Sequence, residues 1–180
     1  MRIETKILNT EFAERTGMAF FGNYISLNND TVVDSAMQNI ASQADNTYFD
    51  GLVSFYINGE LFFAEETTSL SDLWLDLISF RKIMNSKGIA EICFLDSMRS
   101  LFIIETPLGY RLEYQDIQHT FNDKDELLHR VPFTVESMEV EKVKVELAIR
   151  KGFKEYFDFV VENKLPISSN QFQKLLEINI

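Results

Sequence analysis

The sequence predicts an α+β domain in which an antiparallel β-sheet meander packs against a helix at about 69–87 and a long C-terminal helix. Three observations support this prediction. Asn58-Gly59 separates two apolar runs, which is typical of a tight β-hairpin. Soon after this hairpin, leucines and Trp74 are spaced as on one face of a helix. A longer helical pattern fills the last quarter of the chain. At 180 residues, the chain fits a single domain, 1–180.

The first elements are a strand and a helix. "MRIETKIL" has the pattern of a strand, whereas residues 9–31 are ambiguous. A helix is expected through "VVDSAMQNIASQA", with Asp30 as its cap. Its apolar stripe is expected to consist of Val33, Met37, Ile40 and Ala44.

The hairpin around Asn58-Gly59 has a predicted register. Both residues tolerate the positive φ that a type I′ turn needs. With a two-residue loop, the expected cross-strand pairs are Ile57 with Glu60, Phe55 with Phe62, and Val53 with Ala64. Because both faces carry bulky residues, the hairpin is expected to be covered on most of both sides.

The clearest helical pattern is "SLSDLWLDLISFRKIMNSKG". Ser69 is the expected N-cap, and Asp72 three residues later approximates a capping box. Gly88 is the expected helix end. The apolar stripe comprises Leu70, Leu73, Trp74, Leu77, Ile78 and Met84.

Three strand-like runs follow, "IAEICFLD", "SLFIIET" and "GYRLEYQ", and the short loops between them predict an antiparallel meander. "NDKDELL" is a candidate helical turn. "VPFTV" is a candidate last strand, which Pro132 confines to a sheet edge or a strand start. A helix with Met138 on its apolar side is expected from about Ser137 to Lys164, and "SNQFQKLLEI" predicts a short terminal helix.

Negative charge is concentrated in one block of the chain. The net charge is −11, and residues 16–80 contain no Lys or Arg. A field of this sign repels nucleic acid and anionic membranes and attracts basic proteins. The acids of this block are Asp30, Asp34, Asp45, Asp50, Glu60, Glu65, Glu66, Asp72 and Asp76.

Four of these acids are the candidate partner-binding residues: Glu65, Glu66, Asp72 and Asp76. They lie close together in sequence without a counter-charge, and two of them stand four apart on one predicted helix, where like charges repel. The functional hypothesis is a docking patch for a cationic protein partner. The alternative is that a cation from the second half folds over the patch and neutralises it, with these candidates: Arg81, Arg99 and Arg111.

No motif for catalysis, cofactor binding or metal binding is recognised. His119 and His129 lie among several aspartates, Asp116, Asp123 and Asp125, but the spacing matches neither a zinc site nor an EF-hand. There is no glycine-rich phosphate loop and no nucleophile elbow. Cys93, the one cysteine, is expected to be a buried structural thiol.

The expected location is the cytoplasm. The N-terminal segment "MRIETKILNTEFAER" is charged throughout and lacks the apolar core of a signal peptide. No run of apolar residues is long enough to predict a membrane span.

Three segments carry a resemblance: the hairpin "GLVSFYINGELFF", the helix "SLSDLWLDLISF" and the strand "AEICFLD". In this layout, over about residues 50–115, the chain resembles the small acidic immunity proteins of bacterial polymorphic-toxin and contact-dependent inhibition systems. The resemblance implies a cytoplasmic protein that binds a toxin domain, often a basic nuclease, and blocks its site. It assigns no functional residue by position. Two alternatives stay open: a small enzyme or ligand-binding protein with a pocket among the aromatic strands, and a structural or regulatory oligomer.

Overall fold

The computed structural model describes residues 1–9, 23–42, 49–94, 99–121 and 127–178. For 118–121 and 127–130 only the backbone is described. This part of the chain forms two four-stranded antiparallel sheets and five helices, so the predicted α+β class is confirmed. The candidate helical turn in "NDKDELL" falls mainly on 122–126, outside the described residues.

The first sheet has the strand order β2–β1–β3–β4. β1 is Arg2–Leu8, β2 Tyr24–Ser26, β3 Gly51–Ile57 and β4 Glu60–Thr67, and the strand predicted in "MRIETKIL" is confirmed. β2 pairs only with the second half of β1, from Lys6 to Leu8. Among the described strands, the first half of β1 therefore has a neighbour on the β3 side only.

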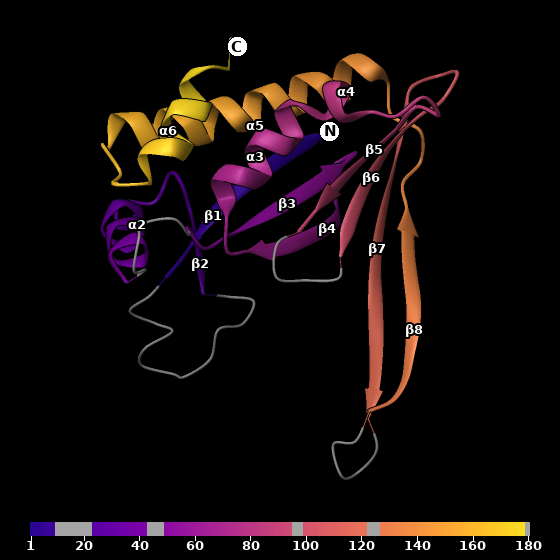
Figure 1. The fold of residues 1–180 in the computed structure, drawn as a ribbon, viewed down its shortest axis with the longest axis horizontal. Coiled ribbons are helices and arrows are strands. Elements are labelled where there is room, and N and C mark those ends of the chain that lie inside the picture. The colour runs from indigo at the N-terminus through magenta and orange to yellow at the C-terminus, as the bar shows by residue number, and fades with distance from the viewer. Residues whose placement is uncertain (10–22, 43–48, 95–98, 122–126, 179–180) are drawn as a thin grey trace.

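The second sheet is the predicted meander, in the order β5–β6–β7–β8. β5 is Ile89–Cys93, β6 Ser100–Glu105, β7 Tyr110–Phe121 and β8 Leu127–Glu136. β6 pairs with β7 only as far as Gln115. Beyond that point β7 and β8 form a two-stranded ribbon that projects from the rest of the fold (Figure 1). Pro132 lies on the terminal strand β8, as its missing N–H predicts.

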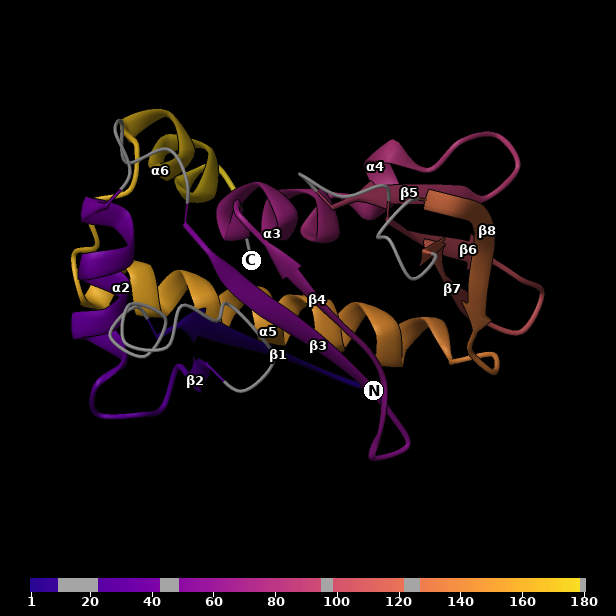
Figure 2. The same cartoon turned by 90° about the horizontal axis from the view of Figure 1, so that it is seen from below.

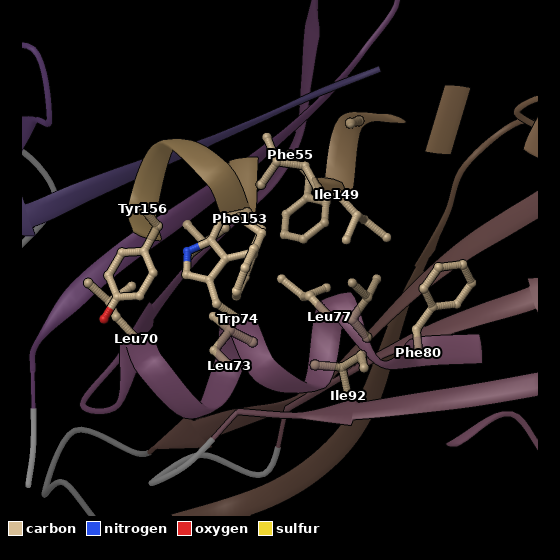
Figure 3. Packing of buried hydrophobic residues seen from close by; sticks show 14 of the residues in the cluster. Phe55, Leu70, Leu73, Trp74, Leu77, Phe80, Ile92, Ile149, Phe153 and Tyr156 are labelled. Atoms are coloured by element: carbon tan, nitrogen blue, oxygen red, sulfur yellow. The ribbon is translucent and has the colours of Figure 1, made fainter. Parts of the chain in front are cut away.

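The helices lie mainly on one side of the first sheet, with α2 at its end (Figures 1 and 2). α2 is Val32–Ala41, α3 Leu70–Ile78, α4 Phe80–Ile83, α5 Lys142–Glu162 and α6 Ser169–Leu176. Trp74 of α3 is fully buried, which confirms its predicted place in the core. Its ring packs beside Phe153 and Tyr156 of α5, with ring centroids 6.5 and 6.4 Å away (Figure 3).

The tight turn is confirmed, but the register of the hairpin is wrong beyond it. Asn58 and Gly59 have φ values of 55° and 89°, and Ile57 pairs with Glu60 as predicted. One extra residue in β4 then shifts the pairing, giving a β-bulge. The observed pairs are Phe55 with Phe63, and Val53 with Glu65. The shift turns Phe63 inward, where it stacks on Phe55 and on Tyr114 of β7, at 4.4 and 4.8 Å.

The helix predicted at 69–87 is interrupted at Ser79. α3 ends at Ile78, and the short α4 follows. Phe80, just after the break, is buried with its ring 5.4 Å from that of Tyr110, so packing on the second sheet redirects the chain. Gly88 has the expected positive φ of 73°, but it belongs to the turn before β5 rather than to a helix end.

The boundaries of two other helices also differ from the prediction. α5 begins at Lys142 rather than near Ser137, because Val140 forms a β-bridge with Tyr110. Met138 consequently lies in a loop and is 62% exposed. In α2 the N-cap is Thr31 rather than Asp30. The buried apolar residues of α2 are Val32, Ala36 and Ile40. Of the predicted stripe, Ile40 is buried, Val33 and Met37 are half-buried against the core, and Ala44 lies outside the described residues.

The predicted burial of Cys93 is wrong. Cys93 is exposed, whereas Ile92 and Phe94 on either side of it are buried. Successive side chains of β5 point to opposite faces of the sheet. An apolar run therefore does not bury each of its members, and Cys93 lies on the outer face beside Glu91.

Candidate functional site

Glu65, a predicted surface acid, is buried at the junction of the two sheets. The β4 bulge turns its side chain inward, and the residue is 2% exposed. Arg99 Nη1 lies 2.6 Å from Glu65 Oε1, and the Tyr114 hydroxyl donates to Oε2 at 2.7 Å. The expectation that Glu65 lies on a docking surface is therefore wrong. The alternative neutralisation by Arg99 is confirmed for this one acid.

The Glu65 network joins both sheets. Arg99, just before β6, also places Nε 3.1 Å from Asp116 Oδ1 of β7. Its side chain is 40% exposed. Burial raises the pKa of the Glu65 carboxyl, although the hydrogen bonds from Arg99 and Tyr114 oppose that rise. Burial and the hydrogen bond to Glu65 together hold the pKa of Tyr114 well above its ordinary value. The network links β4 to the base of the projecting ribbon.

Asp72 has a structural role at the start of α3. Ser69 Oγ donates to Asp72 Oδ2 at 2.6 Å, and Gln171 Nε2 of α6 donates to the same oxygen at 3.1 Å. Ser69 is the N-cap as predicted, but its hydroxyl makes no hydrogen bond to the helix N–H groups. The half-buried carboxylate thus ties the start of α3 to α6 instead of completing a capping box.

Asp76, one turn further along α3, is exposed. It lines an open groove of about 400 Å³ between α3 and α6, together with Asp72 and Glu177. Lys82 and Lys174 line the same groove. Partial burial, and after it the charge of Asp72, raise the pKa of Asp76, while Lys174 opposes the rise. Asp76 is thus an exposed carboxylate in an unfavourable local field.

Glu66 lies on the outer face of β4 and is half-buried. It accepts a hydrogen bond from Tyr24 of β2. Burial, and after it the charge of Glu66, raise the pKa of Tyr24. The four candidate acids are therefore distributed over three places: the junction of the sheets, the outer face of β4, and the α3–α6 groove.

The charge asymmetry of the sequence persists in the fold. In the 16–80 block Glu65 is ion-paired, but six other acids form no ion pair with a described Lys or Arg: Asp30, Asp34, Glu60, Glu66, Asp72 and Asp76. Most described acids of the second half are ion-paired: Glu105, Glu113, Asp116, Glu136, Glu141, Glu146, Glu155 and Asp158. Neither Arg81, which binds Glu146, nor Arg111, which binds Glu113 and Glu136, reaches the block.

The rings of the aromatic strands pack against one another. The ring of Phe63 stacks between those of Phe55 and Tyr114. Phe94 packs edge-on against Phe63, with the ring centroids 6.1 Å apart. These ring contacts lie in the region where the second functional alternative places a ligand.

The structure describes only some of the side chains that the sequence offers as candidate metal ligands. His119 and His129 lie on β7 and β8, where only the backbone is described, and Asp123 and Asp125 lie outside the described residues. Among the side chains that are described, no group of three or more His, Cys, Asp or Glu residues could hold a metal ion. No described helix is long and apolar enough to cross a membrane.

Sequence reasoning missed a second groove, of about 720 Å³, between the start of β1 and α5. Its walls include Arg2 and Glu4 on β1 and Lys151, Glu155 and Glu162 on α5. The end of β2, at Ser26–Asn28, closes one side. No local motif marks this groove, because its three walls come from segments far apart in sequence.

Comparison of the chain with protein-family models, with curated proteins and with solved structures finds no match.

Proposed function

We propose that this chain is a protein-binding module for a cationic protein partner, and that it serves as an immunity protein that neutralises a basic bacterial toxin domain. The observation that carries the proposal is the uneven neutralisation of acids. Six described acids of the 16–80 block form no ion pair with a described Lys or Arg, namely Asp30, Asp34, Glu60, Glu66, Asp72 and Asp76, whereas most described acids of the second half are ion-paired. Unpaired acids steer a partner of opposite charge and select against other partners.

The docking role is assigned to the acids that remain accessible. Asp76 is exposed, and Asp72 and Glu66 are half-buried. Placing Asp72 and Asp76 four apart on one helix costs stability through like-charge repulsion. A cationic side chain of the partner would relieve that repulsion on binding. Glu65 leaves the docking set, and its proposed role is to hold the two sheets together.

The partner is identified by capture from a native cell extract at low and high salt, followed by mass spectrometry. We expect a basic protein that is retained at low salt and lost at high salt, because salt screens the attraction between exposed charges. Co-expression of this chain with the captured protein should relieve growth inhibition if that protein is a toxin. Failure to recover any basic protein at low salt contradicts the binding function. Recovery of a basic protein without toxicity contradicts the immunity role alone.

The Asp72→Asn/Asp76→Asn variant tests the docking acids with the purified pair. We expect slower association and a weaker dependence on salt. The matched control is Glu105→Gln/Glu141→Gln, which removes the same charge from acids that Lys142 and Lys144 already pair. Equal slowing of association in both variants would show that net charge alone causes the effect. Asp72 and Asp76 would then not belong to the proposed docking surface.

A further inference from the structure

The second sheet has an outer face that no described helix covers (Figures 1 and 2). Its inner face carries Tyr110, whose ring contacts that of Phe80 on α4. Successive side chains of a strand point to opposite faces. On β6 the burial alternates accordingly, and Phe102 and Ile104 are half-buried and point to the outer face.

This outer face has an apolar centre that is separate from the core. Ile89 of β5 lies directly opposite Ile104, so Ile89, Phe102 and Ile104 lie together. Other half-buried apolar side chains, such as Val135 of β8, pack against the hydrophobic core, whereas these three are not among them. The solvated face of an antiparallel sheet usually carries polar residues. Adjacent apolar side chains on such a face are typical of an interaction surface.

A row of glutamates crosses the apolar centre. Residues that pair across strands share one face, and the register aligns one residue from each strand in the order Glu91, Phe102, Glu113 and Glu136. Glu91 accepts a hydrogen bond from the Ser100 hydroxyl at 2.9 Å. It is exposed and forms no ion pair with a described Lys or Arg. The carboxylate next to Phe102 on β5 is therefore accessible to a cation of another protein.

On the other side of Phe102, one cation serves two acids. Arg111 places Nη2 4.0 Å from Glu113 Oε2 and Nη1 3.7 Å from Glu136 Oε2. Both distances are longer than that of a charge-assisted hydrogen bond. The side chain of Glu136 is 54% exposed. Three carboxylates and one guanidinium leave the row with a net negative charge, which attracts a cationic partner.

The spacing of the apolar side chains fits a helix that lies along β6. Phe102 and Ile104 are two residues apart on a strand, which is about 6.6 Å. Residues four apart on a helix are separated by about 6 Å along its axis, so two leucines at this spacing would contact both side chains. Basic residues beside the leucines would extend toward Glu91 and Glu136. They belong at the Phe102 end of the face, because Arg111 lies opposite Ile104.

We infer that the outer face of the second sheet binds an amphipathic basic helix of a partner protein, whose apolar side chains cover Phe102 and Ile104 and whose basic side chain pairs with Glu91. This contact goes beyond the proposed function, because it lies on strands β5 and β6 rather than at Asp72 and Asp76. The cationic character of the helix follows from the acids of the second sheet, not from those of the 16–80 block.

The probe is a labelled helical peptide of about 15 residues, built from alanine, leucine and lysine. Its leucines are spaced four apart in one stripe, and its lysines lie beside them. Fluorescence anisotropy gives the affinity, and amide NMR shifts give the contact site. We expect one-to-one binding with the largest shifts at Glu91, Phe102 and Ile104. A peptide of the same composition, with its leucines spread around the helix, should bind at least about tenfold more weakly.

Two variants of the protein test the apolar and the charged contact separately. Phe102→Thr should weaken peptide binding at least about tenfold, and threonine preserves the β propensity of the strand. Glu91→Gln, at an exposed position, should weaken binding by about threefold and lower its salt dependence. Val143→Thr and Glu162→Gln are the matched controls at exposed positions of α5, and they should leave the affinity unchanged.

The Asp72→Asn/Asp76→Asn variant should bind the peptide with nearly unchanged affinity, which separates this face from the docking acids of the proposed function. Equal affinity of the two peptides, shifts centred on the α3–α6 groove, absence of binding, or a protein dimer that Phe102→Thr abolishes would each overturn the inference. A captured basic protein whose affinity is insensitive to Phe102→Thr would overturn it and spare the proposed function. Peptide binding as expected, without capture of any basic protein, would contradict the proposed function alone.

Discussion

Gly152 of α5 lies so close to Trp74 of α3 that a Cβ at position 152 would overlap the ring carbon Cη2 of the indole. The two helices approach each other because residue 152 has no side chain. Trp74 in turn donates from Nε1 to Thr5 Oγ1 of β1 at 3.1 Å. The Trp74 side chain thus connects both main helices to the first sheet.

Gly152→Ala should destabilise the protein in spite of the better helix propensity of alanine. The propensity gain is about 1 kcal/mol, whereas forcing an atom into a close-packed core costs about 1–3 kcal/mol. We expect a net loss of about 1 kcal/mol in the free energy of unfolding, measured by urea titration. Lys154→Ala, at an exposed α5 position, is the control and should change little. A more stable Gly152→Ala protein would show that the helices can separate at no cost.

Trp74→Ala should lower the free energy of unfolding by about 3–5 kcal/mol, because it leaves a cavity among buried rings. Before mutation, the fluorescence of the single tryptophan should have the short-wavelength maximum of a buried indole, shifting to longer wavelength on unfolding. A native emission maximum equal to that of the unfolded chain would contradict the packing of α3.

Arg99→Met tests the junction of the two sheets. It removes the cation from Glu65, whose side chain is 3% exposed. We expect a loss of about 2–3 kcal/mol, below the value for a fully buried pair because Arg99 is 40% exposed. Arg150→Met, at an exposed α5 position without a described ion pair, should stay within about 0.5 kcal/mol of the original protein.

The same variant should respond to pH in a defined direction. Without the guanidinium, the pKa of Glu65 rises further, since Arg99 opposes the effect of burial. A carboxyl with a raised folded-state pKa stabilises the fold at low pH and loses that contribution as pH increases through the folded-state pKa. The defect of Arg99→Met should therefore be smaller at about pH 4 than at pH 7. A defect of constant size would mean that Glu65 does not titrate in this window.

Asp76→Asn should stabilise the protein at neutral pH by about 0.3 kcal/mol, because it removes the repulsion from Asp72. The pKa of Asp76 is raised above the ordinary value of 3.8, so the folded state holds this proton more tightly than the unfolded chain does. The ionised Asp76 carboxylate therefore lowers the stability of the fold once the pH exceeds its folded-state pKa. Unfolding titrations should show the gain at pH 7 and its loss below about pH 3.8. Glu155→Gln, which removes a paired carboxylate, should show no such gain.

The sequence predicted correctly several features that depend on residue type and on spacing along the chain. The positive φ values of Asn58 and Gly59, the antiparallel meander and the burial of Trp74 all follow from residue type and spacing. Ser168 also caps α6 through its hydroxyl, which accepts from the Gln171 N–H, as the terminal helix pattern allows. For the turn and the α6 cap, the decisive interactions lie within a few residues along the chain. The burial of Trp74 was predictable from its place in the apolar stripe of α3, although its contacts come from β1 and α5.

The errors come from contacts between distant segments. The bulge in β4 places Phe63 against Tyr114, about fifty residues away, and no feature of the hairpin itself marks it. The same bulge buries Glu65, so one missed residue also moved one of the four candidate acids from the surface to the junction of the sheets. The break at Ser79 likewise depends on Phe80 meeting Tyr110. The sequence indicated the acidic block correctly, but not which of its members a distant arginine would reach.

The projecting ribbon of β7 and β8 affects the tendency of the protein to aggregate at high concentration. β8 ends the second sheet, and an outer strand with free N–H and C=O groups can template the stacking of further chains into fibrils. Val131 and Phe133 on this strand are 51% and 42% exposed, so the strand also presents apolar surface to solvent. Pro132 between them has no N–H, so the row of donors is interrupted at its middle. The pyrrolidine ring of Pro132 therefore disfavours the pairing of a further chain along this edge strand.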